Sequence, residues 1–176
     1  MRMKPGGSSK GMHQIAIAFG SNLGNRRANI LKACFLLSRK IRISGISSFY
    51  RNMPRENVRG GYFLNGALVG TTDLSPQQLL NFTKSVEEML GRPRTHRPLN
   101  PRTIDIDIIF YDDAIIKKKG LQIPHPKVAS RDFVLRGLAE LIPLRRHPVL
   151  GKTVAELFRE LKNENHPHKK RTCRTS

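Results

Sequence analysis

Apolar and polar residues follow two different spacings along the chain. Five runs are rich in β-branched or aromatic residues, or alternate between apolar and polar positions, which is typical of strands. They are residues 14–19, 41–50, 62–72, 103–111 and 121–123. Other segments carry apolar residues at three- and four-residue intervals and predict helices. These segments are residues 30–39, 75–90, 130–141 and 153–161.

Helix-starting signals support three of the predicted helices. Ser75 precedes Pro76 and has Gln at the third helical position, a capping-box pattern with proline in the first turn. Thr153 and Glu156 have the same box spacing. Ser130 can cap the helix that ends near residue 141.

The order strand, helix, strand, strand, helix, strand predicts an α+β fold with a ferredoxin-like βαββαβ core and C-terminal additions. A chain of 176 residues with 38% apolar content suits one domain. We expect that domain at residues 14–162. A disordered basic extension at residues 1–13 and a disordered basic tail at residues 163–176 flank it.

Charge and cysteine content limit the classes of function. The chain holds 32 Lys and Arg against 13 Asp and Glu, a formal charge of +19, which attracts nucleotides, nucleic acids and anionic membranes alike. Cys34 lies in an apolar helical run and Cys173 is far away, so neither a disulfide framework nor a zinc site is indicated. The apolar run at 15–19 is too short for a signal peptide or a membrane span, and we expect a cytoplasmic protein.

Two aspartates stand out in the strand at 103–111. Asp105 and Asp107 are two positions apart, so their carboxylates project from one face with backbones about 6.6 Å apart. This pattern can be the solvated face of an amphipathic strand. However, Asp is disfavoured in strands and neighbouring anions repel, which favours a cation site, and two carboxylates suit Mg²⁺.

An arginine- and proline-rich loop leads into these aspartates. Arg92, Arg94, Arg97 and Arg102 fall within it, and guanidinium groups fit phosphate oxygens. A solvated basic loop is the simpler interpretation of this segment alone. Next to a carboxylate pair it indicates phosphoryl-type transfer, which depends on positioning and charge neutralisation.

Two further motifs are weaker. The turn at residues 20–25 lacks both G-x-G-x-x-G spacing and the lysine of a Walker A loop, so we interpret it as a turn that leads into a helix. His125 lies between two prolines, and a lone histidine is more often structural.

In combination these motifs resemble the 6-hydroxymethyl-7,8-dihydropterin pyrophosphokinase family, from Ile15 to about Pro143. The family moves pyrophosphate from ATP to a pterin alcohol in folate synthesis, with AMP as the leaving group. The matching segments are Gly20-Ser21-Asn22-Leu23-Gly24, Ser47-Ser48-Phe49-Tyr50, Phe63-Leu64-Asn65, Gly91-Arg92, Pro101 through Asp107, and Pro124-His125-Pro126.

The resemblance implies a role for each candidate residue. Asp105 and Asp107 would bind two Mg²⁺ ions, while Arg92 and Arg102 would be catalytic and hold phosphates in the transition state. The ATP-binding residues would be Glu87, Arg94, Ile108, His125 and Arg131. The pterin would stack between Phe63 and Phe133, with Asn65 and Asn52 at its polar edge. Leu99-Asn100 replaces a Trp-Gly pair found in many relatives, so closure over the pterin must differ here.

Two other hypotheses stay open at this stage. The positive charge could serve an RNA-binding ferredoxin-like module, although no RNP-like aromatic pattern is visible. A palm-like nucleotidyl transferase or cyclase could use the same two aspartates without a pterin pocket. We expect ATP and hydroxymethyl-dihydropterin as small-molecule partners of a monomer, without membrane or nucleic-acid binding.

Overall fold

The computed structural model describes residues 11–53, 61–92 and 100–165. Within them, four strands of a five-stranded antiparallel sheet have the order β2-β4-β1-β5. The fifth strand, the short β3, pairs with the beginning of β4, on the same edge as β2. The strands of the sheet are β1 (His13–Ser21), β2 (Arg42–Ile46), β3 (Tyr50–Asn52), β4 (Phe63–Thr72) and β5 (Asp105–Tyr111). The order and directions match the predicted ferredoxin-like core.

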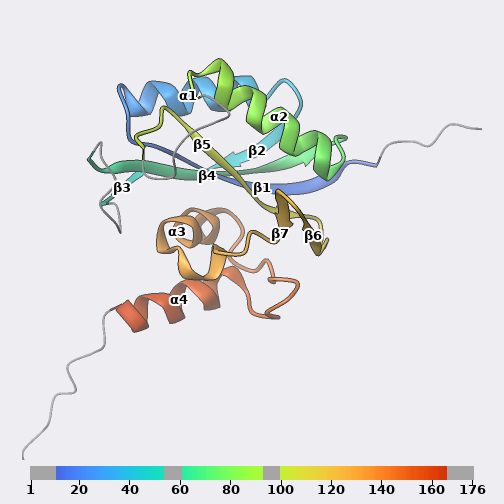
Figure 1. The fold of residues 1–176 in the computed structure, drawn as a ribbon. Helices are drawn as coiled ribbons and strands as arrows, with labels where there is room; N and C mark the ends of the chain where they lie inside the picture. The colour runs from blue at the N-terminus through green and yellow to red at the C-terminus, as the bar shows by residue number, and fades with distance from the viewer. Residues whose placement is uncertain (1–10, 54–60, 93–99, 166–176) are drawn as a thin grey trace, which may run out of the picture.

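Helices cover both faces of this sheet (Figure 1). On one face lie α1 (Arg26–Leu37) and α2 (Pro76–Met89), and on the other lie α3 (Asp132–Leu141) and α4 (Val154–Asn165). A small hairpin of β6 (Ile116–Lys118) and β7 (Leu121–Ile123) follows β5, and a single 3₁₀ turn, η1 (Val128–Ser130), precedes α3. The predicted C-terminal additions therefore form a third layer.

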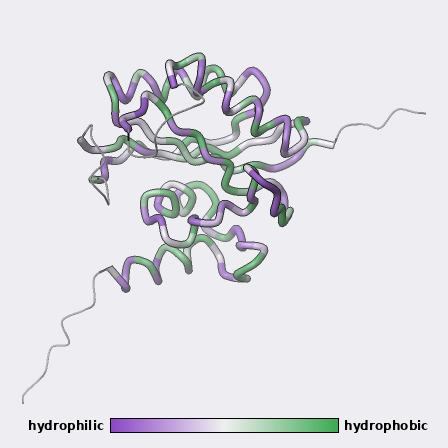
Figure 2. The backbone as a smooth tube through the Cα atoms, in the orientation of Figure 1, coloured by the Kyte–Doolittle hydropathy of each residue, from purple (hydrophilic) through white to green (hydrophobic). Residues whose placement is uncertain are grey.

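The alternation of β1 separates two hydrophobic cores. Ile15, Ile17 and Phe19 pack with α1, α2 and two isoleucines of β5, Ile106 and Ile108. Ala16 and Ala18 face the other side and pack with α3 and α4. Figure 2 shows the hydrophobic colour concentrated in the strands and on the sheet-facing sides of the helices. The small alanines let α3 lie close to the sheet.

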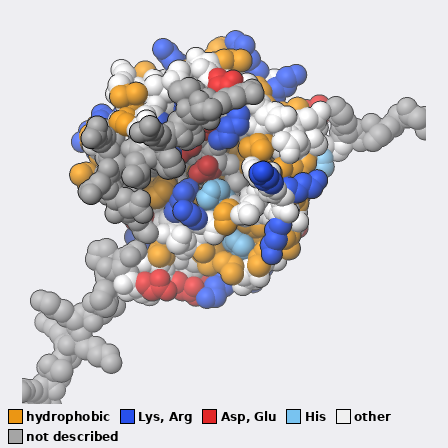
Figure 3. All heavy atoms as spheres, viewed as in Figure 1, with side chains coloured by type: hydrophobic (Ala, Val, Ile, Leu, Met, Phe, Trp, Pro, Cys, Tyr) orange, Lys and Arg blue, Asp and Glu red, His pale blue; other side chains and the backbone are white. Residues whose placement is uncertain are grey.

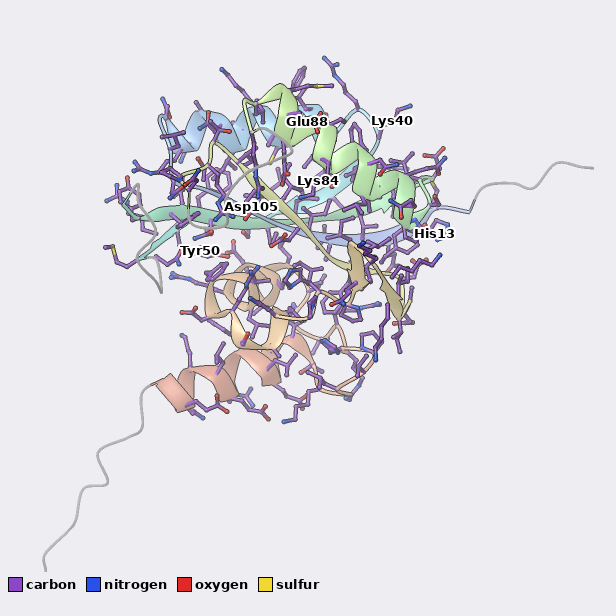
Figure 4. All side chains as sticks on the ribbon, viewed as in Figure 1. His13, Lys40, Tyr50, Lys84, Glu88 and Asp105 are labelled. Carbon is purple, nitrogen blue, oxygen red and sulfur yellow. The ribbon has the colours of Figure 1, made fainter. Side chains whose placement is uncertain are left out.

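Close packing of α3 depends on a glycine. A Cβ atom at Gly137 would stand 2.3 Å from the Tyr50 hydroxyl and 3.0 Å from the Ala67 side chain. Tyr50, on the α3 side of the sheet in Figure 4, donates a hydrogen bond of 2.9 Å to the Phe133 carbonyl. This contact fixes the start of α3 against β3.

The structure corrects several predicted boundaries. The single strand expected at 41–50 is two strands, because regular pairing with β4 is interrupted at Ser47, whose hydroxyl accepts from the Ala67 amide while its own amide donates to the Ala67 carbonyl. The β6 strand was missed. Ser130 does not cap α3, since it belongs to η1 and Arg131 holds the cap position without a side-chain bond. Helix α4 continues to Asn165, past the boundary expected at residue 162.

Other local predictions are confirmed. Ser75 and Gln78 form the reciprocal capping box of α2, and Thr153 and Glu156 form that of α4. Cys34 is buried in α1 as a free thiol. The predicted extensions lie largely outside the described residues, at 1–10 and 166–176, and remain predictions. Across the described ranges, no helix has both the length and the apolar character needed to cross a bilayer.

Candidate active site

Asp105 lies at the start of β5, where each of its carboxylate oxygens is bonded to a different arginine. The Arg102 Nη1 donates to Asp105 Oδ2 at 2.7 Å, and Arg92 donates to the other carboxylate oxygen. Burial by itself raises the pKa of Asp105, but the two guanidinium groups outweigh it and hold that pKa below its ordinary value. The carboxylate is therefore ionised at neutral pH.

Asp107 lies on the same face of β5, as the strand spacing predicted. The side chains of Asp105 and Asp107 are 26% and 28% exposed, whereas Ile104, Ile106 and Ile108 are buried. Arg131 Nη1 donates to Asp107 Oδ2 at 2.9 Å. The two aspartates thus form one partly open acidic pair, bordered by three arginines.

His125 is fixed beside Asp107. Its amide donates to the Ile109 carbonyl, and its Nδ1 accepts a hydrogen bond from the Lys127 amide at 3.2 Å. In the neutral imidazole the proton is then on Nε2, which is 3.8 Å from Asp107 Oδ2. Burial lowers the pKa of His125, and Asp107 only partly offsets this, so the ring is neutral at pH 7.

Glu87, expected on the ATP side of the site, is a buried carboxylate on α2. Only 4% of it is exposed, and its carboxylate accepts hydrogen bonds from Arg92 Nη1 at 2.8 Å, the Ile106 amide at 2.7 Å and Lys84 Nζ at 3.0 Å. Burial raises its pKa, while Lys84 and Arg92 lower it. Glu87 therefore holds Arg92 and β5 in place, and it is not among the residues that line the adjoining pocket.

A pocket of about 500 Å³ extends from Asp107 between α2, β5 and the β6–β7 hairpin. Ile108 and His125, both expected near ATP, line it. The lining also includes residues that sequence reasoning missed: Leu80, Lys84, Ile106, Lys117, Lys118, Lys119, Gly120, Leu121, Gln122 and Pro126. The three consecutive lysines were the visible signal for this segment. In Figure 3, acidic, basic and histidine side chains lie close together near the middle of the visible face.

The four residues expected at the pterin are grouped around the ends of β3, β4 and α3. Asn52 pairs with Phe63 across the two strands, and the side chains of Asn52 and Asn65 are hydrogen-bonded to each other. Asn65 is 4% exposed. The Arg102 guanidinium lies 5.8 Å from the Phe63 ring centroid, and Arg131 lies 5.8 Å from the Phe133 ring. Both expected stacking rings thus adjoin the arginines of the acidic pair.

The turn at residues 20–25 contributes to the site through Asn22. As predicted, it leads into a helix, and the Asn25 side chain caps α1. The buried Asn22 side chain also accepts a hydrogen bond from the Arg102 amide at 2.8 Å, and the Asn22 amide donates to the Arg102 carbonyl. This second role was not predicted. Arg94 and Leu99 lie outside the described residues, and Asn100 is exposed.

A protein-family description, 7,8-dihydro-6-hydroxymethylpterin-pyrophosphokinase (HPPK), matches residues 16–143, most of the chain. The chain belongs to this family. The match decides against the RNA-binding module and the palm-like transferase as the identity of the domain. HPPK enzymes transfer pyrophosphate from ATP to hydroxymethyl-dihydropterin in folate synthesis, and this chain is a transferase of that kind.

Curated relatives of this HPPK include proteins of very different lengths. The 2-amino-4-hydroxy-6-hydroxymethyldihydropteridine pyrophosphokinase of Aquifex aeolicus is 39% identical over 145 residues, covering 82% of this chain and 90% of that protein. The folic acid synthesis protein FOL1 of Dictyostelium discoideum is 40% identical over 92% of this chain. The chain spans only 24% of that longer relative.

Solved structures of HPPK proteins share the fold. A Plasmodium falciparum HPPK-DHPS triple mutant superposes with a TM-score of 0.75 at 18% identity, covering 90% of this chain and 46% of that chain. A wild-type structure of the same protein gives a TM-score of 0.73 at 17% identity. At these identities the likeness establishes the fold of this HPPK and nothing further.

Proposed function

We propose that the acidic pair Asp105 and Asp107, with Arg92, Arg102 and Arg131 around it, is the centre at which pyrophosphate passes from ATP to 6-hydroxymethyl-7,8-dihydropterin. The observation that carries this proposal is the projection of both carboxylates from one face of β5, between arginines from three different segments. Such an arrangement suits a reaction in which negative charge must be neutralised and aligned.

Two Mg²⁺ ions fit the donors of this pair. Both aspartates offer carboxylate oxygens on a partly exposed surface, and the lowered pKa of Asp105 keeps its carboxylate available as a ligand. Mg²⁺ usually takes one or two protein carboxylates and fills its shell with water and phosphate oxygens. Among the described residues no group of three or more His, Cys, Asp or Glu side chains is placed to hold a metal ion, so water and phosphate oxygens would have to complete the shell of either ion. Bound there, Mg²⁺ would neutralise phosphate charge as a Lewis acid.

The arginines exchange partners when substrate binds. In the structure, the guanidinium groups of Arg92, Arg102 and Arg131 are held by the two aspartates. Phosphate oxygens would draw these groups from the carboxylates, which leaves the aspartates to the metal. Glu87 keeps a hold on Arg92 throughout, because its contact does not involve Asp105.

The acceptor lies between Phe63 and Phe133, with the amides of Asn65 and Asn52 at its polar edge. Flat heteroaromatic ligands favour this combination of stacking and edge hydrogen bonds. The acceptor's hydroxymethyl oxygen then bonds to the β-phosphorus, the bond from that phosphorus to the α–β bridging oxygen breaks, and AMP leaves. The proton of the acceptor hydroxyl is released to solvent water in this step.

The pocket beside Asp107 would hold the nucleotide. Leu80 and Ile108 offer apolar surface for the base, while His125 and the lysines of the β6–β7 hairpin offer polar groups for the rest of the nucleotide. Arg94 is proposed to contact ATP as well. The domain proposed at residues 14–162, which α4 extends to Asn165, is proposed to act as a monomer in the cytoplasm.

Replacement of the aspartates tests this proposal. Asp105→Asn and Asp107→Asn should each lower the rate of AMP and pterin diphosphate formation at least about 100-fold, because a metal ligand is lost. A coupled AMP assay measures this, and circular dichroism confirms folding. Asp113→Asn, at an 85% exposed carboxylate, is the matched control and should be active. Wild-type turnover in both site variants, or ADP as the product, would refute the assignment.

A further inference from the structure

A second pocket lies on the α1 side of β3 and β4, away from the acidic pair. It measures about 420 Å³ and is formed by the first turn of α1 and the two strands. Its lining residues are Gly24, Asn25, Arg26, Arg27, Phe49, Arg51, Tyr62 and Leu64. None of these described residues is acidic, and none belongs to the site proposed for pyrophosphate transfer.

Strand alternation separates this pocket from the acceptor site. Asn52 pairs with Phe63, and both belong to the proposed pterin site. Arg51 pairs with Leu64, one position along each strand, so these residues project from the opposite face. The same two short strands therefore present the acceptor residues on one side and this basic pocket on the other.

Three arginines are held together by aromatic rings. The guanidinium carbons of Arg26 and Arg51 lie 4.2 and 4.7 Å from the centroid of the same Tyr62 ring. Arg27 lies 5.7 Å from the Phe49 ring. Stacking of this kind orders long side chains before any ligand arrives, which reduces the entropy lost on binding. It also concentrates like charges that repel one another.

The ligand chemistry follows from this arrangement. Fixed guanidinium forks match phosphate oxygens, and an anion would relieve the repulsion between them. Because two arginines already contact Tyr62, the pocket offers charge rather than an open ring for base stacking. Its volume lies in the range of small-molecule sites.

We propose that this pocket is a second binding site, specific for a small ligand with two or more phosphate groups. It is independent of the transfer reaction, because no proposed catalytic or substrate-binding residue lines it. Arg27 and Arg51 are its exposed recognition groups, and Arg26, half-buried, anchors the cluster on Tyr62.

Calorimetric titration of the full chain with inorganic pyrophosphate tests this site. The wild-type protein should bind two pyrophosphates, one at the acidic-pair arginines and one here. Arg27→Gln/Arg51→Gln should leave the first event unchanged and weaken the second about 10-fold or more, as two charged hydrogen bonds are lost. Its turnover at saturating substrates should match the wild type. This activity readout separates failure of the second site from failure of the transfer mechanism.

Arg39→Gln/Arg159→Gln is the matched control, because it removes the same charge from exposed arginines elsewhere and Arg39 also lies near an aromatic ring, that of Phe35. It should keep both binding events. The proposal fails if the wild type binds a single pyrophosphate, or if the control loses as much affinity as the site variant. It also fails if a twelve-nucleotide single-stranded RNA binds through Arg27 and Arg51 while pyrophosphate does not.

Discussion

At the scale of single residues, Glu87 both stabilises the fold around the proposed site and positions one of its arginines. Its buried carboxylate bonds to the main active-site strand at Ile106 and to Arg92, which in turn bonds to Asp105. A charge buried in this way persists because it is paired and hydrogen-bonded. The position of Arg92, which is proposed to bind phosphate, therefore depends on the Glu87 carboxylate.

Two substitutions at Glu87 should separate these roles. Glu87→Gln keeps an oxygen for the Ile106 amide but loses the ion pair with Arg92, so turnover should fall about 10-fold with a loss of about 1–3 kcal/mol in unfolding free energy. Glu87→Ala also leaves that amide unsatisfied and should lose about 1–3 kcal/mol more. Urea unfolding and AMP formation measure both effects. Glu164→Gln, on the exposed side of α4, is the control, and equal behaviour of all three variants would contradict this role.

Residue-level prediction succeeded where local spacing decides the outcome. The common face of Asp105 and Asp107 follows from the period of a strand, and the sequence suffices to predict it. The roles of Glu87 and Asn22 do not follow from spacing. Glu87 meets Ile106 across 19 positions and Asn22 meets Arg102 across 80, and only the packed fold brings them together.

At the scale of elements, the short strand β3 links the acceptor site to α3. Tyr50, at the start of β3, bonds through its hydroxyl to the Phe133 carbonyl in the first turn of α3. Burial raises the pKa of Tyr50 to about 12, so the hydroxyl keeps its proton and acts as a donor at physiological pH. One hydrogen bond thus sets the distance between the two sides of the proposed pterin site.

Removal of that hydroxyl should weaken acceptor binding specifically. We expect Tyr50→Phe to raise KM for the pterin several-fold, because Phe133 loses its backbone anchor, and to leave KM for ATP unchanged. Tyr111→Phe is the matched control, since the buried Tyr111 hydroxyl makes an equivalent 2.9 Å bond to the Leu74 carbonyl. Both variants should lose about 1 kcal/mol of stability. Steady-state kinetics with each substrate varied in turn measure the two KM values. An equal rise in KM for the pterin and for ATP would count against this role of Tyr50.

The starts of helices with clear capping residues were predicted accurately, whereas the bounds of elements that depend on tertiary contacts were not. The capping boxes gave the starts of α2 and α4 correctly. The break between β2 and β3 depends on two hydrogen bonds between Ser47 and Ala67, twenty positions away: the Ala67 amide donates to the Ser47 hydroxyl, and the Ser47 amide donates to the Ala67 carbonyl. No local residue marks this break. Short strands such as β6 carry too few positions for a period to be recognised.

At the scale of the whole molecule, the charge of +19 creates a field that attracts anionic substrates from beyond contact distance. The acidic pair itself lies among arginines, so the negative groups of the site do not reverse this field locally. ATP is a polyanion and the pterin alcohol is uncharged. The two substrates should therefore differ in their response to salt.

Between about 50 and 300 mM KCl, kcat/KM for ATP should fall several-fold as the Debye length shortens from about 14 to about 6 Å. The same ratio for the pterin, measured at saturating ATP, should change little. Initial-rate assays at both KCl concentrations, with the Mg²⁺ concentration held constant, provide the comparison. Equal salt dependence for the two substrates would show that long-range attraction does not contribute.

The strand that carries both aspartates is also an edge of the sheet, since β5 pairs with a strand on one side only within residues 11–53, 61–92 and 100–165. On its open side, Glu87 binds the Ile106 amide and the His125 amide binds the Ile109 carbonyl. An exposed edge invites strand addition by another molecule, which leads to aggregation. Glu87, which positions Arg92, and His125 therefore also occupy backbone groups that a second chain would need, so loss of Glu87 should lower solubility as well as activity.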